Sequence, residues 1–252
     1  MLSVKGIKAA AYNIGAGVIG YPARRRQHRE VLAFYSQFIQ PDAICFDIGA
    51  NMGNRTQVFR ELGASVIAVE PQNFCMKFLQ QKFSDDNKVV LIKKALGAEE
   101  GTAEMMLSDA TTVSTLSKDW VREMSASGRF GNCKWDKKET VPVTTFDSLI
   151  AEYGFPAFCK IDVEGYEFEV LKGLTQPVGT ISLEYASELI KNTISCVNYL
   201  AGLGEVKFNY SEGEEMELVL PEWVNAGTMS DILQKMKGTA WGDIYARFQR
   251  TQ

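Results

Sequence analysis

The chain has 252 residues, of which 46% are hydrophobic and 23% are charged. These fractions are typical of a soluble globular protein, and they exclude a collagen, a coiled coil and a disordered chain. Lysine and arginine total 27 and aspartate and glutamate total 31, so the formal net charge is −4. Because a surface that coats nucleic acid needs an excess of basic residues, we expect no nucleic-acid partner.

The cysteines predict a reducing compartment. Their number is odd, and no two of them have the C-x-x-C spacing of a redox or zinc motif. Free thiols are typical of cytoplasmic proteins, so we expect a cytoplasmic location. A single histidine, His28, argues against a histidine-rich zinc site. The five cysteines are Cys45, Cys75, Cys133, Cys159 and Cys196.

The N-terminal 42 residues differ in character from the rest of the chain. A run of small residues at 9–19 loosely resembles the apolar part of a signal peptide, but Asn13 and the basic residues at 24–26 favour a helical arm. No stretch reaches the roughly 18 apolar residues of a membrane span. We predict an arm at 1–42 and one domain at 43–252, with an insertion at about 102–144.

From residue 43 onward, apolar runs of strand length alternate with helical patterns, which predicts crossover units and a parallel sheet. A helix is expected at 54–62. A second helix is expected to open at Pro71 and to bury Phe74, Phe78 and Leu79. The strands expected in this first half are 44–46, 66–69 and 89–92.

The second half of the chain continues this alternation after the insertion. Two extended segments, 102–107 and 140–144, predict a hairpin around a polar segment. A late helix is expected to begin at Ser230 and Asp231 and to end at Gly238. The other expected elements are strands at 157–161, 181–183, 206–210 and 244–248, and helices at 166–171 and 187–203.

A glycine-rich turn follows the first strand, and it differs from the dinucleotide-binding G-x-G-x-x-G motif. The glycines, Gly49 and Gly53, are four positions apart, and Asp47 at the strand end would repel a pyrophosphate. A ligand with a positive charge is expected instead. S-adenosylmethionine meets this need, with an ammonium for Asp47 and a carboxylate for the amides at the helix N-terminus.

An acidic residue, Glu70, ends the second strand about twenty positions after Gly49. A carboxylate at that separation is placed to accept hydrogen bonds from both ribose hydroxyls of a bound nucleoside. The turn and the glutamate together therefore predict a site for an adenosine-bearing cofactor.

A second group of acidic residues follows the later strands. Asp162 ends the strand expected beside the first one, and Glu184 ends the next. Two carboxylates at neighbouring strand ends can flank a reacting hydroxyl, orient it or take its proton. They can also hold a hard cation, although we assign no metal ligand from the sequence.

Three segments together resemble the FkbM family of S-adenosylmethionine-dependent methyltransferases, over roughly residues 43–185. They are Asp-Ile-Gly-Ala-Asn-Met-Gly-Asn at 47–54, Ala-Val-Glu-Pro at 68–71 and Lys-Ile-Asp-Val-Glu-Gly-Tyr-Glu at 160–167. The resemblance implies an α/β fold, a doubly wound seven-stranded class I methyltransferase (Rossmann-like) sheet whose last strand is antiparallel. It also implies O-methylation of hydroxyls on sugars, glycoconjugates or secondary metabolites.

The resemblance also assigns roles to individual residues. Glu70 would hold the ribose, and Asp162 would face the transferred methyl group and the acceptor, with Glu184 as our second candidate for the base. Pro71, Ala95 and Leu96 would lie against the adenine. The methionyl end of the cofactor would be lined by Asp47, Gly49, Asn51, Gly53 and Thr56.

Two functions of other classes are alternatives to this interpretation. One is a nicotinamide-dependent oxidoreductase on a similar sheet, against which the glycine spacing and Asp47 argue. The other is a catalytically idle module that binds the cofactor. For the enzyme, the expected partner is a hydroxyl-bearing small molecule or glycan, and no oligomeric state is predicted.

Overall fold

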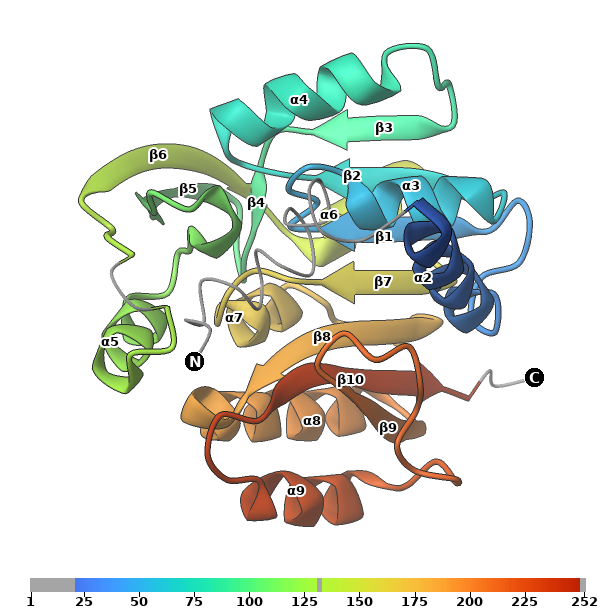
Figure 1. The fold of residues 1–252 in the computed structure, drawn as a ribbon, viewed down its shortest axis with the longest axis vertical. Helices are drawn as coiled ribbons and strands as arrows, with labels where there is room; N and C mark the ends of the chain where they lie inside the picture. Colours follow the sequence, from blue (N-terminus) through green and yellow to red (C-terminus); the bar gives the residue numbers. More distant parts are fainter. Residues whose placement is uncertain (1–20, 131–132, 250–252) are drawn as a thin grey trace.

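The computed structural model describes residues 21–130 and 133–249, so residues 1–20 of the arm predicted at 1–42 lie outside the described residues. Its main feature is a seven-stranded sheet with the order β3-β2-β1-β7-β8-β10-β9 (Figure 1). β10 is antiparallel to both of its neighbours, which confirms the predicted fold class. The strands are β1 (Ile44–Ile48), β2 (Ser65–Val69), β3 (Val89–Ile92), β7 (Phe158–Ile161), β8 (Thr180–Ala186), β9 (Val206–Glu212) and β10 (Trp241–Phe248).

Helices cover both faces of this sheet, because the side chains of each strand alternate between two apolar cores. One core contains the apolar faces of α2 (Tyr21–Tyr35), α3 (Asn54–Glu61) and α4 (Asn73–Phe83). The other core contains those of α6 (Phe146–Tyr153), α7 (Glu167–Lys172), α8 (Ile190–Leu203) and α9 (Ala226–Lys235). None of the helices formed by the described residues is both long and apolar enough to cross a bilayer.

Helix α2 and the residues after it are fastened to the sheet by aromatic rings. Phe38 stacks on Tyr245 of β10 with ring centroids 5.3 Å apart, and Tyr35 contacts Phe59 and Phe158 edge-on. These rings are buried. The described part of the predicted arm is therefore packed against the seven-stranded sheet.

The insertion forms a small second sheet with a helix beside it. The sheet has the order β4-β6-β5, with β4 (Ala95–Leu96), β5 (Gly101–Leu107) and β6 (Lys137–Thr144), and the helix is α5 (Lys118–Ser127). The predicted hairpin is confirmed by the antiparallel pairing of β5 and β6. In Figure 1, β5, β6 and α5 lie on the side to which the parallel strands point.

Two of the contacts that attach the insertion to the main domain lie near the carboxyl ends of β7 and β8. The Thr115 hydroxyl donates a 2.7 Å hydrogen bond to the carbonyl of Glu164, in the loop after β7. The guanidinium of Arg129 forms a two-pronged ion pair with Glu188, in the short 3-10 helix Ser187–Leu189. Both partners of this pair are largely buried. The insertion is thus held against the carboxyl edge of the sheet.

Two helix predictions are wrong in detail. Helix α4 begins at Asn73, beyond Pro71, and the residues that it buries are Cys75, Met76 and Leu79. Phe74 and Phe78 are 61% and 41% exposed, so Leu79 is buried as predicted but the two phenylalanines are not.

Helix α9 begins at Ala226 and not at Ser230, because the side chain of Asn225 caps it by accepting the N–H of Thr228. Helix α6, which the sequence analysis did not predict, is capped in the same way by Thr145.

Candidate active site

The glycine-rich turn after β1 lies directly against the end of β7. Gly49 has a φ of 82°, and a Cβ placed on it would lie 2.0 Å from the carbonyl oxygen of Asp162. Asn51 and Gly53 also have positive φ, at 48° and 73°. A side chain at position 49 would therefore be excluded both by the backbone conformation and by the neighbouring strand.

Asp47 is buried beneath this turn, with 2% of its surface exposed. The Thr56 hydroxyl, from α3, donates a 2.5 Å hydrogen bond to Asp47 Oδ2. Burial raises the pKa of Asp47, although this hydrogen bond and the nearby charge of Lys160 oppose the change. Asp47 is thus a carboxylate whose charge a bound cation would help to stabilise.

Glu70 connects the turn to the end of β2. Its carboxylate accepts the backbone N–H of Asn51 at 2.9 Å and that of Gln72 at 2.8 Å. Glu70 is 2% exposed, and burial raises its pKa to about 7 even though these two N–H groups act in the opposite direction. The first two predicted motifs therefore form a single site.

A cavity next to Glu70, which we call the Glu70 cavity, has mainly apolar walls on one side. Pro71, Ala95 and Leu96 line it, and all three are buried. The insertion supplies further walls, including Met105 and Leu116. A flat apolar ring with hydroxyls at one end would match this combination of an apolar surface and a buried carboxylate.

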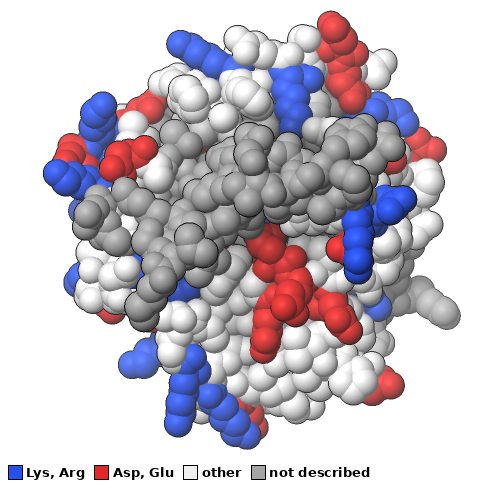
Figure 2. Space-filling view, viewed as in Figure 1, with Lys and Arg blue, Asp and Glu red and all other residues white. Residues whose placement is uncertain are grey.

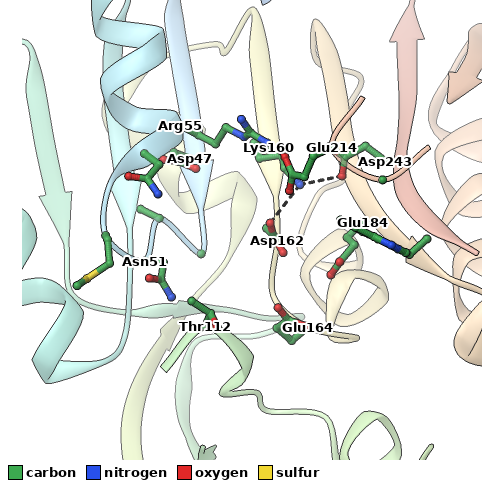
Figure 3. Close-up of a pocket in the computed structure, with 16 residues that line it drawn as sticks. Asp47, Asn51, Arg55, Thr112, Lys160, Asp162, Glu164, Glu184, Glu214 and Asp243 are labelled. Atoms are coloured by element: carbon green, nitrogen blue, oxygen red, sulfur yellow. Dashed lines mark hydrogen bonds and ion pairs between the residues drawn. The ribbon is translucent and has the colours of Figure 1, made fainter. Parts of the chain in front are cut away.

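A second cavity adjoins the first, and half of the residues that line it are charged (Figure 3). The two cavities share Gly49, Asn51 and Asp162 in their walls. We call the second one the acidic cavity. Its charged lining residues are Asp47, Arg55, Lys160, Asp162, Glu164, Glu184, Glu214 and Asp243. Figure 2 likewise shows acidic side chains gathered at the centre of this face of the molecule.

Lys160 forms the floor of the acidic cavity, and its side chain is 3% exposed. Its Nζ lies 2.9 Å from Asp243 Oδ1 and 3.4 Å from Asp162 Oδ2 (Figure 3). Burial opposes the charge of the lysine, but the carboxylates of Asp162 and Asp243 outweigh it and raise the pKa of Lys160 well above its usual value. Lys160 is therefore a fixed cation that orients Asp162.

Carboxylate oxygens of Asp162, Glu164 and Glu184 lie within 4.8 Å of one another. Oxygens grouped in this way can accept hydrogen bonds from a polyhydroxylated ligand, and they are also the type of ligand that hard cations take. Glu167 lies behind them, where burial and then the charge of Glu184 raise its pKa to about 7. The group is thus an electronegative wall of the acidic cavity.

Most of the predicted site residues line one of these cavities, but two support the site from behind. Thr56 holds Asp47 and lines neither cavity. Gly53 leaves room for the side chains of Leu79 and Phe83, which a Cβ would approach to 2.7 and 2.6 Å. These two residues shape the turn without contributing to the cavity walls.

Five charged residues of the acidic cavity received no role from the sequence: Arg55, Lys160, Glu164, Glu214 and Asp243. Lys160 was visible in the third motif, next to Asp162. Asp243 was missed because β10 is antiparallel and brings its beginning, not its end, to this edge, where Asp243 pairs with Glu184. Glu214 lies in a loop after β9 that no motif marks.

This sheet order and paired-cavity site define a class I S-adenosylmethionine-dependent methyltransferase. A family model described as the methyltransferase FkbM domain matches residues 47–217, so the chain belongs to the FkbM methyltransferase family. A search of curated proteins finds no match to this sequence.

Many solved structures resemble the chain in fold, and three of them illustrate the similarity. Precorrin-6y C5,15-methyltransferase from Geobacter metallireducens GS-15 is 12% identical, with a TM-score of 0.46 and coverage of 99% of this chain and 100% of that chain. An rRNA methylase from Streptococcus thermophilus is 11% identical, with a TM-score of 0.42 and coverage of 93% of this chain and 100% of that chain. A methyltransferase-like protein from Streptococcus mutans, solved in complex with SAH, is 13% identical. Its TM-score is 0.41, and the match covers 91% of this chain and 99% of that chain.

The residues of the two cavities fit the family's cofactor, S-adenosylmethionine. Gly49 lets the turn lie directly against the end of β7, and Glu70 offers a buried carboxylate to hydroxyl donors beside an apolar wall. The adjoining cavity offers Asp47 to a cation. An apolar wall, then the Glu70 carboxylate and then Asp47 match the base, the ribose and the charged amino-acid end of such a nucleoside.

Proposed function

We propose that this protein transfers the methyl group of S-adenosylmethionine to a hydroxyl oxygen of a sugar, a glycoconjugate or a secondary metabolite. The observation that carries the proposal is the grouping of the Asp162 and Glu184 carboxylates, which line the acidic cavity beside the turn at Gly49. Oxygen nucleophiles need a base within hydrogen-bond reach, and a carboxylate at this position can serve.

Each part of the cofactor has candidate contacts. We assign Glu70 to the ribose and the apolar surfaces of Pro71, Ala95 and Leu96 to the adenine. We assign the methionyl end to Asp47, Gly49 and Asn51, with Gly53 and Thr56 shaping and supporting them.

The cofactor supplies a methyl group on a sulfonium, which makes that methyl a good electrophile. The chain's own residues then position the acceptor and remove its proton. Lys160 holds the Asp162 carboxylate from one side, at 3.4 Å, and so restricts its orientation. Asp162 is our first candidate for the base, and Glu184 is the second, because each can accept the hydroxyl proton.

The charge of the acidic cavity supports a neutral or cationic acceptor. Among the described residues that line it, six are acidic and two, Arg55 and Lys160, are basic. A polyanion such as nucleic acid would be repelled by this excess of negative charge. Hydroxyl groups donate hydrogen bonds to carboxylates and are therefore suited to this cavity.

We also propose a cytoplasmic location. All five cysteines are free, and four of them are buried, as is usual for proteins of a reducing compartment. Membership of a methyltransferase family argues against the alternative of a nicotinamide-dependent oxidoreductase. Turnover of any acceptor would remove the idle-module alternative.

The proposal is tested by an acceptor screen with the purified protein and methyl-labelled S-adenosylmethionine. Release of S-adenosylhomocysteine is measured for sugars, glycoconjugates and hydroxylated metabolites, with amine-only acceptors as the comparison. NMR of the product then identifies the methylated atom. A methyl ether is expected, whereas a product methylated on nitrogen or carbon would contradict O-methyl transfer.

A further inference from the structure

Arg55 brings a cation to a cavity in which acidic lining residues outnumber basic ones. It is the second residue of α3, the helix that follows the glycine-rich turn, and its side chain is 13% exposed. In Figure 3 the side chain extends from α3, past Asp47, toward Lys160 and Glu214. The sequence predicts an anionic group at the amides of this same helix end and assigns no role to Arg55.

The guanidinium of Arg55 is held by two partners. Its Nη2 lies 2.7 Å from Glu214 Oε2, in the loop after β9. Its Cζ lies 5.5 Å from the centroid of the buried Tyr35 ring, a cation–π distance. Arg55 is therefore ordered before any ligand binds, so that little side-chain entropy is lost on binding.

A carboxylate entering this cavity needs a cation, because the walls carry carboxylates from β1, β7, β8 and β10. The methionyl end of S-adenosylmethionine has one carboxylate and one ammonium. Asp47 suits the ammonium, but the partial charge of the α3 N-terminus alone contributes little against several full negative charges. A nearby full positive charge would overcome this repulsion.

Lys160 is less suited than Arg55 to bind that carboxylate. Its side chain is only 3% exposed and lies between Asp162 and Asp243, whose charges it balances. Arg55 is more accessible, and a planar guanidinium can bind one carboxylate through two parallel hydrogen bonds.

We propose that Arg55 binds the carboxylate of the methionyl end and is thereby the residue with which this chain recognises the amino-acid part of its cofactor. The inference rests on the family's cofactor and not on the acceptor or on O-methyl transfer. It can therefore be tested by binding alone, whatever the acceptor screen finds.

The test compares two probes that differ at the amino-acid end. S-adenosylhomocysteine has the carboxylate, and 5′-methylthioadenosine has the same nucleoside without it. Isothermal titration calorimetry is carried out with both probes on the wild type and on Arg55→Gln, Arg55→Lys and Arg60→Gln. Arg60 is a matched control, because it lies on the same helix and pairs with Asp86 at 2.8 Å, outside both cavities.

We expect Arg55→Gln to weaken S-adenosylhomocysteine binding by about 10- to 100-fold, the range for a charge-assisted hydrogen bond, and to change methylthioadenosine binding by less than about twofold. Arg55→Lys should weaken the binding of S-adenosylhomocysteine by less than Arg55→Gln does. Arg60→Gln should leave the affinity for both probes unchanged.

Two outcomes would overturn the proposal. If Arg55→Gln weakens both probes equally, the arginine supports the site and does not recognise the carboxylate; if it weakens neither, the helix amides suffice. Glu214→Gln is a control for a general loss of structure at this ion pair. It keeps the guanidinium of Arg55 and removes the charge of its partner. Binding of S-adenosylhomocysteine to Glu214→Gln should be retained, and a loss equal to that of Arg55→Gln would also overturn the proposal.

Discussion

The ammonium of Lys160 and the carboxylate of Asp243 form a 2.9 Å ion pair across the strands of the catalytic sheet, with 3% and 13% of their side chains exposed. Removing the lysine would leave Asp243 buried without this partner. We expect Lys160→Met to lower the free energy of unfolding by about 3–5 kcal/mol. Urea denaturation followed by circular dichroism measures the change.

The control for this prediction is Lys138→Met. Lys138 pairs with Glu104 at 2.6 Å, but the two side chains are 57% and 51% exposed. We expect Lys138→Met to lower the free energy of unfolding by less than about 1 kcal/mol. Equal losses at the two lysines would show that burial of the Lys160 pair has no special effect on stability.

Gly49 has no space for a side chain, because the carbonyl of Asp162 would lie 2.0 Å from its Cβ. We expect Gly49→Ala to lower the free energy of unfolding by at least about 2 kcal/mol and to abolish measurable binding of S-adenosylhomocysteine. Gly128→Ala isolates the backbone effect, since Gly128 has a φ of 69° with nothing within 4 Å. If both variants retain binding, the close approach at Gly49 does not shape the site.

Glu70 gives cofactor binding a pH dependence. Its pKa is raised to about 7, and ribose hydroxyls donate to the ionised form. Affinity for S-adenosylhomocysteine should therefore rise by up to about tenfold between pH 6 and pH 8, as the carboxylate ionises. Calorimetric titrations across this range measure the change, and Glu70→Gln should remove the dependence.

Stability without cofactor should respond in the opposite direction. Because the folded pKa of Glu70 lies above the ordinary value of 4.5, its contribution to stability is complete below pH 4.5 and is lost as pH rises toward 7. Glu167 shares this behaviour, because its pKa is also about 7, but it does not line the Glu70 cavity. A Glu167→Gln variant should thus keep the pH dependence of cofactor affinity.

Asp162 and Glu184 should affect turnover more than cofactor affinity. With an acceptor identified by the screen, Asp162→Asn should lower kcat by about 10²–10⁴-fold, the usual contribution of a general base. Affinity for S-adenosylhomocysteine should change by less than about threefold, since neither oxygen is needed to hold the nucleoside. Initial rates and calorimetry separate the two effects. Full turnover in both Asp162→Asn and Glu184→Gln would remove these residues from the chemistry.

The sheet and half of the candidate site could be predicted from local patterns. Asp47, Gly49 and Glu70 lie at the carboxyl ends of adjacent parallel strands, and such ends meet at one edge by the rules of the fold. Their proximity therefore followed from sequence once the strands were located.

The other half depends on tertiary contacts that no local pattern reveals. Arg55 meets Glu214, which is 159 positions away, and Asp243 reaches the site only because β10 is antiparallel. Apolar residues at helical spacing favour Phe74 and Phe78 as part of the buried face of α4, but the face that packs against the sheet carries Cys75, Met76 and Leu79.

Calorimetric titration of S-adenosylhomocysteine into the wild type, Asp47→Asn and Glu70→Ala tests most directly whether the cofactor binds between the ends of β1 and β2. We predict one binding site per chain in the wild type and affinities at least about tenfold weaker in each variant. No heat of binding with the wild type, or variants that bind as tightly as the wild type, would contradict this account.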